Sequence, residues 1–232
     1  TKGNMAYIST VMVHPVYRRK GIATKLMKTV ISYVRKKKLS RAVLHVATTN
    51  AQAKALYHKL GFRKFEDTIY LVADIDSLRK LGNVEGIQIR KLKRKDIETV
   101  YNLIKRSEDP THLKVFDFKE KDLKTPLIQR VFRFSTGEKV VAVKDGEIVG
   151  YAEASCTTAK ESGHIKNVQV HPEMRSNGIE EMLIIAGIDH IRKVGTNKVM
   201  ATTNSTRQKL IESMKQLGFE KYLEMETMVL QF

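Results

Sequence analysis

The stretch that decides the fold is VHPVYRRKGIA, residues Val13–Ala23, which returns later in the chain as VHPEMRSNGIE, residues Val170–Glu180. Two shorter blocks repeat in the same order: ATTN at 47–50 returns at 201–204, and LGF at 60–62 returns at 217–219. The three offsets are 157, 154 and 157 residues. Solenoid repeats recur every roughly 20–50 residues, so this longer period indicates one domain-sized unit that is present twice.

The second copy is complete, whereas the first copy lacks its beginning. Residue 1 corresponds to about residue 158, and nothing in the first copy matches residues 87–157. We therefore expect a partial unit over residues 1–80 and a complete unit over residues 81–232. Three explanations stay open: the chain is a fragment of a longer protein, which we favour; the second copy or another subunit covers the open sheet edge; or the first copy never completes a site.

Apolar periodicity predicts strands and helices in alternation in both copies, which favours a layered α/β architecture. In the first copy we expect strands at 6–13, 42–48 and 68–73 and helices at 21–37 and 51–60. In the second copy we expect strands at 87–91, 139–143, 148–154, 165–170, 198–203 and 225–230, helices at 96–105 and 178–193, and a short helix ending at Leu217. Residues 107–136 look irregular, and Asp145-Gly146 predicts a hairpin.

The stretch Val13–Ala23 has the chemistry of an anion cradle between a strand and a long amphipathic helix. Backbone N–H groups at a helix start have no partner within the helix, and the helix dipole adds positive charge there. Gly21 and the small Ala23 would let a phosphate approach the backbone closely. The neighbouring run Arg18–Lys20 supplies three cations.

These residues resemble the GNAT superfamily of acyl-CoA-dependent N-acyltransferases. Its signature, Arg/Gln-x-x-Gly-x-Gly/Ala after a strand, is matched by Arg18–Ala23. A second family pattern, Asn-x-x-Ala-x-x-Leu-Tyr-x-Lys-x-Gly-Phe, is matched at every fixed position by Asn50–Phe62. The resemblance is closest to the ribosomal-protein and N-terminal acetyltransferase branch. It implies a mixed, mostly antiparallel sheet flanked by helices, present twice in the chain.

The resemblance also implies a reaction, in which an amine attacks the thioester of acetyl-CoA directly. Pantetheine would pair with the edge of Val11–Val13, and the pyrophosphate would sit on the amides of residues 19–24. The residues assigned to the cofactor in this way are Val11, Met12, Val13, Arg18, Arg19, Lys20, Gly21, Ile22, Ala23, Thr24, Asn50 and Ala53.

Two residues of the first copy are candidates for proton transfer. Tyr57 would donate a proton to the departing CoA thiolate. His45 stands where related protein acetyltransferases carry a glutamate, and histidine is a reasonable base because its ordinary pKa lies near 6.5. The alternatives are a half-buried tyrosine and a histidine of the core.

The second copy departs from the family pattern at the cradle. Glu180 replaces Ala23, and a carboxylate at a pyrophosphate site has the wrong sign. The counterpart of Tyr57 is Ile211 or Met214, depending on the alignment, and neither can donate a proton. We expect the second copy to be structural or to act on the acceptor side, so the alternative function is an acyl-CoA-binding pseudo-acetyltransferase without turnover.

The net charge of +17 is unevenly spread, with +12 in residues 1–86 and +5 in residues 87–232. The run Arg35–Lys38 is typical of a solvated helix end. The single Cys156 excludes an intrachain disulfide, and we expect no metal site. The apolar runs are too short for a membrane span, and no signal peptide is evident, so we expect a cytoplasmic protein with no membrane partner.

The partners that we expect are acetyl-CoA and an amine acceptor, either a protein or a small molecule. Protein α-amines, lysines, polyamines and small amines all stay open as acceptors. No aromatic-rich strand or zinc-finger pattern favours a nucleic acid. A dimer is compatible with the sequence.

Overall fold

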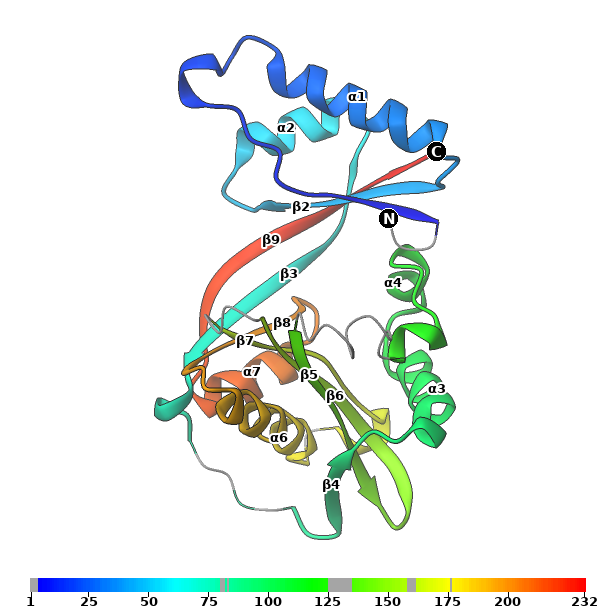
Figure 1. Cartoon of the computed structure of the whole chain (residues 1–232), viewed down its shortest axis with the longest axis vertical. Helices are drawn as coiled ribbons and strands as arrows, with labels where there is room; N and C mark the ends of the chain where they lie inside the picture. Colours follow the sequence, from blue (N-terminus) through cyan, green and yellow to red (C-terminus); the bar gives the residue numbers. More distant parts are fainter. Residues whose placement is uncertain (1–3, 80–81, 83, 125–134, 158–161, 176) are drawn as a thin grey trace. The chain divides into compact units, whose positions relative to one another are not determined.

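The computed structural model describes residues 4–79, 82, 84–124, 135–157, 162–175 and 177–232 (Figure 1). The chain forms two compact units, each considered by itself below. Unit 1 comprises Thr1–Thr68 and Leu223–Phe232, and unit 2 comprises Ile69–Tyr222. Two strands, β3 (Arg63–Asp74) and β9 (Glu220–Gln231), contribute residues to both units.

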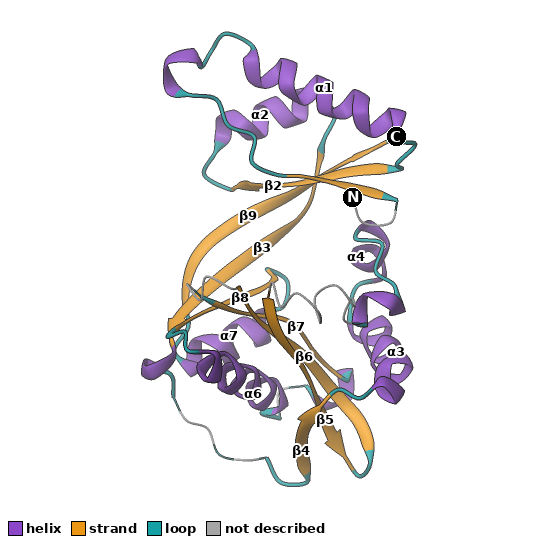
Figure 2. Cartoon of the chain, in the orientation of Figure 1, coloured by secondary structure: helices purple, strands orange, loops and turns teal. Residues whose placement is uncertain are grey.

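Unit 1 holds the elements of the first copy and the end of the last strand. These elements are β1 (Met5–Ile8), the 3-10 turn η1 (Pro15–Tyr17), α1 (Ile22–Lys36), β2 (Arg41–Ala47) and α2 (Ala51–Lys59). β1 pairs with β2 in parallel, and β9 pairs with β2 in antiparallel, in the strand order β1-β2-β9-β3. Both helices pack on one face of these strands (Figure 2).

The core of unit 1 follows from the periods of its elements. Apolar residues three to four apart give α1 a buried stripe, Met27, Ile31 and Val34. Every second residue of β2 meets this stripe, because successive side chains of a strand point to opposite faces. The buried cluster also includes Ala42, Leu44, Val46, Tyr57, Phe62, Met228 and Leu230.

Unit 2 holds the second copy and the end of β3. Its described elements are η2 (Ile75–Ser77), β4 (Ile87–Lys91), η3 (Arg94–Asp96), α3 (Ile97–Ser107), α4 (Pro110–Val115), η4 (Glu120–Leu123), β5 (Ser135–Lys144), β6 (Glu147–Thr157), β7 (Gly163–Val170), η5 (Pro172–Met174), α6 (Ile179–Val194), β8 (Lys198–Asn204) and α7 (Gln208–Leu217). The strand order is β3-β8-β7-β6-β5-β4. β7 and β8 run in parallel, whereas β4, β5, β6 and β7 form antiparallel neighbours.

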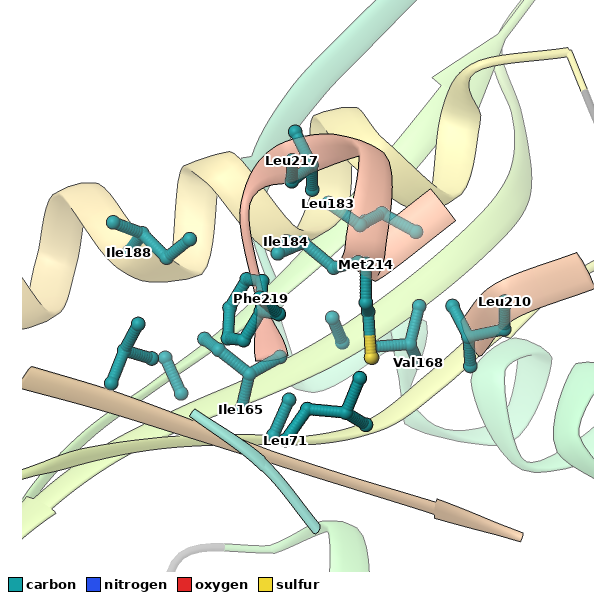
Figure 3. Packing of buried hydrophobic residues seen from close by; sticks show 14 of the residues in the cluster. Leu71, Ile165, Val168, Leu183, Ile184, Ile188, Leu210, Met214, Leu217 and Phe219 are labelled. Carbon is teal, nitrogen blue, oxygen red and sulfur yellow. The ribbon is translucent and has the colours of Figure 1, made fainter. Parts of the chain in front are cut away.

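The largest buried cluster lies in unit 2, where α6 and α7 cover the sheet. Leu183 and Ile184 of α6, Met214 of α7 and Phe219 just after α7 lie in one cluster with Leu71 of β3 (Figure 3). Leu71 is fully buried, and β3 also supplies Ile69 and Ala73 to this cluster. A strand that the sequence places in the first copy thus completes the core of unit 2.

The two copies exchange their last strands. In the repeat, β3 ends the first copy and β9 ends the second, yet β9 pairs with β2 from Arg41↔Gln231 to Ala47↔Met225. β3 in turn neighbours β8 of the second copy. The predicted fold class, a duplicated and mostly antiparallel sheet with flanking helices, is confirmed. The division of the sequence between residues 80 and 81 stays a prediction. Because the last strands are exchanged, unit 2 includes the end of β3 from the first copy, and unit 1 includes most of β9 from the second copy.

Most predicted elements are present, and the corrections concern two strand ends and one segment that was expected to be irregular. The strand expected at 6–13 ends at Ile8, because Thr10 adopts a left-handed backbone with φ 58° that breaks the extended chain. The strand expected at 68–73 begins earlier, at Arg63. Within 107–136, expected to be irregular, residues 110–115 form α4, and residues 125–134 lie outside the described part of the chain. The predicted hairpin is confirmed, since Lys144 pairs with Glu147 around Asp145-Gly146.

Candidate active site

The cradle predicted at Val13–Ala23 is formed by a sharp turn into α1. Gly21 precedes the helix in a left-handed conformation, φ 77° and ψ 2°. Lys25 N–H donates the first helical hydrogen bond, to the Gly21 carbonyl oxygen at 3.0 Å. The amides of Ile22, Ala23 and Thr24 precede that bond, so they form the open N-terminal end of the helix. A Cβ placed on Gly21 would meet no heavy atom within 4 Å, so space is open above the cradle.

The cations of the cradle are exposed, and one of them also holds the turn together. Arg18 Nε donates a hydrogen bond to the Val13 carbonyl oxygen at 3.1 Å. Lys20 Nζ lies 5.7 Å from the centre of the Tyr17 ring. Arg18 therefore has a structural role in addition to its charge, and the helix N-terminus with its cations is suited to a diphosphate.

Val11–Val13, predicted to pair with pantetheine as a strand edge, lie in irregular chain after β1. The pairing of β1 with β2 ends at Ile8↔Leu44, and Thr10 then turns the chain away. Met12 is 76% exposed, which leaves this segment accessible. Because β1 ends at Ile8, Val11–Val13 are not a strand edge as expected. The segment stays a candidate for contact with pantetheine.

Tyr57 lies in α2, with its ring in the core of unit 1. Its ring centre is 6.0 Å from that of Phe62, and the residue is 7% exposed. Burial raises the pKa of the Tyr57 hydroxyl, which keeps the phenol protonated as a proton donor must be. Asn50 sets the start of the same helix, because its side-chain oxygen accepts a hydrogen bond from Ala53 N–H at 3.1 Å. Of these two predicted cofactor residues, Asn50 is thus the N-cap of α2 and Ala53 supplies the amide that it caps.

His45 lies on the other face of β2. Its neighbours Leu44 and Val46 pack under the helices with Tyr57, so alternation directs His45 to the opposite side. The Tyr7 ring meets the imidazole edge-on, with ring centres 5.4 Å apart. Burial lowers the pKa of His45, and the nearby Glu66 carboxylate partly offsets the effect. The structure thus places Tyr57 on the helix-covered side of β2 and His45 on the opposite side. His45 directly follows Leu44, where the pairing of β1 with β2 ends.

The equivalent turn of unit 2 has a similar backbone conformation at its glycine, but different side chains lie around it. Gly178 has φ 79° and ψ 0°, and Arg175 Nε donates to the Val170 carbonyl oxygen at 3.4 Å. Asn167, the counterpart of Thr10 in the second copy, is also left-handed, with φ 54°. The duplication of the cradle is therefore visible in the backbone at Thr10 and Asn167 and at Gly21 and Gly178.

Side chains occupy the surroundings of the second cradle. A Cβ on Gly178 would lie only 2.9 Å from Val84 Cγ2. Glu180 is 6% exposed at the start of α6. Burial lowers the pKa of Arg207, which the carboxylates of Glu108 and Glu180 counteract.

Two short hydrogen bonds close the same region further. Gln169 Nε2 donates to Glu108 Oε2 at 2.6 Å, and an Arg175 guanidinium N–H donates to the Ser107 carbonyl oxygen at 2.6 Å. Gln169 is 3% exposed, whereas its counterpart Met12 is exposed. The open space that surrounds Gly21 therefore has no match at Gly178.

Sequence reasoning missed the residues that come from the exchanged strand. Glu226 of β9 lies opposite Val46, and Lys54 Nζ of α2 approaches Glu226 Oε2 at 3.6 Å. Thr227 lies opposite His45, and its hydroxyl is 3.3 Å from that of Thr68. Sequence pattern alone gives no signal for these contacts, because the residues are more than 150 positions from their partners.

The comparisons with known proteins agree with this geometry. The sequence profile described as Acetyltransferase (GNAT) family matches residues 1–62 and 97–219, which is well over half of the chain. The chain therefore belongs to the GNAT acetyltransferase family. The described helices include none that is long and apolar enough to cross a membrane. Among the described residues, no group of three or more His, Cys, Asp and Glu side chains could hold a metal ion.

Two relatives are named mycothiol acetyltransferase. The protein from Saccharomonospora viridis is 23% identical over 223 residues, which cover 92% of this chain and 71% of the relative. The protein from Renibacterium salmoninarum is 22% identical over 218 residues, which cover 91% of this chain and 63% of the relative. This chain thus spans about two thirds of the length of each.

Solved structures with the same fold include a tandem GNAT protein from the clavulanic acid biosynthesis pathway. It has a TM-score of 0.72 and 18% identity, and the match covers 98% of this chain and 75% of that chain. A GCN5-related N-acetyltransferase from Sphaerobacter thermophilus has a TM-score of 0.69 and 18% identity, over 94% of this chain and 70% of that chain. These likenesses support the tandem GNAT fold.

Proposed function

We propose that the first copy binds acetyl-CoA and transfers its acetyl group to a primary amine. The observation that carries this proposal is the open, left-handed Gly21 at the start of α1, beside the exposed Arg18, Arg19 and Lys20. The cradle suits the diphosphate of a CoA ester, because amides, helix dipole and cations all favour negative charge there. Membership of the acetyltransferase family supports acetyl as the group transferred.

In the proposed reaction the acceptor amine attacks the thioester carbonyl carbon, and the C–S bond breaks. Tyr57 donates its phenolic proton to the departing thiolate sulfur, so CoA leaves as a thiol. His45 takes a proton from the attacking nitrogen. Its lowered pKa keeps the imidazole neutral near pH 7, which is the form that accepts a proton.

The second copy has a different role in this proposal. Val84 occupies the place where a diphosphate would approach Gly178, and Glu180 adds a buried carboxylate at the start of α6. The side chains of Gln169 and Glu108, which are joined by a hydrogen bond, occupy the same region. We assign this copy to stabilising the exchanged strands rather than to binding a second CoA ester.

One observation favours a second candidate, an acyl-CoA-binding pseudo-acetyltransferase. Tyr57 and His45 lie on opposite faces of β2, so a working site needs the thioester to reach both of them at the end of the β1–β2 pairing. Without such an approach the chain would bind acetyl-CoA and not turn it over.

A single pair of measurements separates the two functions. Acetyl-CoA binding is measured by calorimetry, and thiol release is measured with a panel of amines, for the wild-type chain and for Tyr57→Phe. The enzyme predicts amine-dependent thiol release that falls about 100-fold or more in Tyr57→Phe, with acetyl-CoA affinity retained, because general acid catalysis contributes roughly 10²–10⁴-fold. Tight binding without thiol release from any amine would leave only the pseudo-acetyltransferase, and absent binding would contradict both.

A further inference from the structure

The chain carries a second cationic cluster, at the far end of α1 from the cradle. Residues 1–65 contain fifteen Lys and Arg and no Asp or Glu, and the densest run is Arg35–Lys38. α1 has fifteen residues from Ile22 to Lys36, so at about 1.5 Å per residue its two ends lie roughly 22 Å apart. A diphosphate in the cradle cannot reach both ends, so it does not account for this second cluster.

The four cations all face solvent. Arg35, Lys36, Lys37 and Lys38 are exposed, and none of them forms an ion pair with another residue in the described part of the chain. The helix dipole favours cations in the last turn, which accounts for Arg35 and Lys36. Lys37 caps the helix and Lys38 lies beyond it, where that effect fades.

The backbone of Lys38 adds a second observation. This residue has φ 54°, a left-handed conformation in which glycine and asparagine are the favoured residues. A lysine at this position is strained, and its side chain extends the run of cations past the helix end. Local folding preferences therefore do not account for the last member of the cluster.

Two exposed aromatic rings accompany these cations. Tyr33 is 56% exposed, and Lys37 Nζ lies 5.5 Å from its ring centre. Phe232 is 41% exposed, and Arg35 Cζ lies 5.3 Å from its ring centre. Both contacts are within the range of cation–π attraction, so the rings hold two of the cations in place.

The exchanged strand brings Phe232 to this end of the helix. β9 pairs with β2 as far as Arg41↔Gln231, and Phe232 N–H then donates to the Ser40 carbonyl oxygen at 3.0 Å. Figure 1 shows the end of β9 beside the end of α1. The fold therefore adds a second ring, that of Phe232, to the Tyr33 ring that already accompanies Arg35–Lys38 in the sequence.

We propose that this surface, made of Tyr33, Arg35–Lys38 and Phe232, binds a single strand of RNA. Lys and Arg would neutralise successive phosphates, and the exposed ring faces would stack with bases. Proteins that bind single strands combine these two features, a cationic track and aromatic platforms. An acidic polypeptide would contact the cations alone, whereas the bases of a single strand would also stack on the exposed rings, so the aromatic residues favour the nucleic acid.

The test is fluorescence anisotropy of a labelled oligouridine of about 12 nucleotides, titrated with the full chain. If four phosphates are neutralised, the affinity falls about 50-fold between about 50 mM and about 200 mM salt, from a slope near −0.7 per contact. Lys36→Glu/Lys37→Glu should weaken binding by at least tenfold and flatten that slope. Tyr33→Ala should weaken binding about tenfold, as loss of one stacked base does.

Lys93→Glu/Lys95→Glu is the matched control. Lys93 and Lys95 are exposed cations of unit 2, and this variant changes the net charge by the same amount. It should leave RNA affinity within about twofold of the wild-type value. Equal losses in the two double variants would overturn the proposal, because net charge alone would then explain binding.

Two further outcomes would also overturn it. One is no measurable binding at about 50 mM salt. The other is competition by polyglutamate as effective as that by unlabelled oligouridine at equal charge, which would identify an acidic protein as the partner. Acetyl-CoA binding, measured in parallel, should not change in Lys36→Glu/Lys37→Glu, so the result is independent of the proposed function.

Discussion

Lys54 Nζ lies 3.6 Å from Glu226 Oε2 and joins α2 to the strand that ends the chain. The helix carries Tyr57, whereas the strand belongs by sequence to the other copy. The Glu226 side chain is 7% exposed and that of Lys54 is 28% exposed, so this pair is shielded from solvent more than a surface pair is. The position of the predicted acid therefore depends on a strand more than 150 residues away.

Glu226→Gln should destabilise the chain by about 1–2 kcal/mol, because it leaves the Lys54 ammonium half-buried without its partner. Chemical denaturation measures this change. Glu120→Gln is the control, since Glu120 forms a more exposed pair with Lys124 at 3.3 Å. That control should cost less than about 0.5 kcal/mol. An equal loss of stability in both variants would show that the Lys54–Glu226 pair contributes no more than an exposed surface pair.

The left-handed glycines that begin the two cradle helices allow a matched test of the cradle. Gly21→Ala and Gly178→Ala place a Cβ at φ 77° and φ 79°, so each should cost about 1–2 kcal/mol of stability from backbone strain. Gly178→Ala also brings its Cβ to 2.9 Å from Val84 Cγ2.

Acetyl-CoA affinity should respond to only one of these changes. The Cβ of Gly21→Ala projects into the open space above the cradle, and we expect calorimetry to show affinity at least tenfold weaker. Gly178→Ala should bind as the wild-type chain does. A loss of affinity in Gly178→Ala alone would assign the cofactor to the second copy.

The repeat in the sequence predicted the duplicated cradle well, because its geometry is local. Gly21 and Gly178 adopt nearly identical backbone angles, as the shared Val-His-Pro and Gly positions indicated. The strand end at Ile8 was not predictable, since the left-handed residue beyond it is Thr10 and carries no glycine or proline signal. The consecutive apolar residues Val11–Val13 therefore looked like a continued strand.

The exchange of strands could not be predicted from the sequence, for a different reason. β3 and β9 hold the same place in the repeat and both carry apolar residues, so the apolar pattern alone does not decide which of them pairs with β2. The choice depends on contacts such as Lys54 with Glu226 and Thr68 with Thr227, which no local pattern encodes. The opposite facing of His45 and Tyr57 follows from alternation in β2, but only after the helix-covered face is known.

The pH dependence of turnover tests His45 as the base. Burial lowers the pKa of His45 below its usual value near 6.5, and Glu66 offsets only part of this shift. Since the neutral imidazole is the active form, kcat/KM should rise with pH below about 6.5 and show no further step from this group above it.

His45→Gln should remove that acidic step and lower kcat/KM by about 100-fold at pH 7. A step that persists unchanged in His45→Gln would belong to another group, such as the acceptor amine itself. The position of His45 opposite Tyr57 would then be structural.

Ala23→Glu transfers the charge of the second cradle into the first. Glu180 occupies the equivalent position at the start of α6, where it is buried near Arg207. A carboxylate about 4 Å from a phosphate charge costs roughly 4 kcal/mol at an effective dielectric near 20, so acetyl-CoA affinity should fall by about a thousandfold. Ala23→Gln adds similar bulk without charge and should lose much less, which separates charge from size.

The reciprocal change, Glu180→Ala, should not create a second site. Val84 still approaches Gly178, and Gln169 still donates to Glu108. We expect calorimetry to give one acetyl-CoA per chain for the wild-type protein and for Glu180→Ala, with stability lowered by about 1–3 kcal/mol because Arg207 loses a nearby carboxylate. Two bound acetyl-CoA molecules in Glu180→Ala would show that one carboxylate is all that closes the second cradle, and would contradict the side-chain filling described for unit 2.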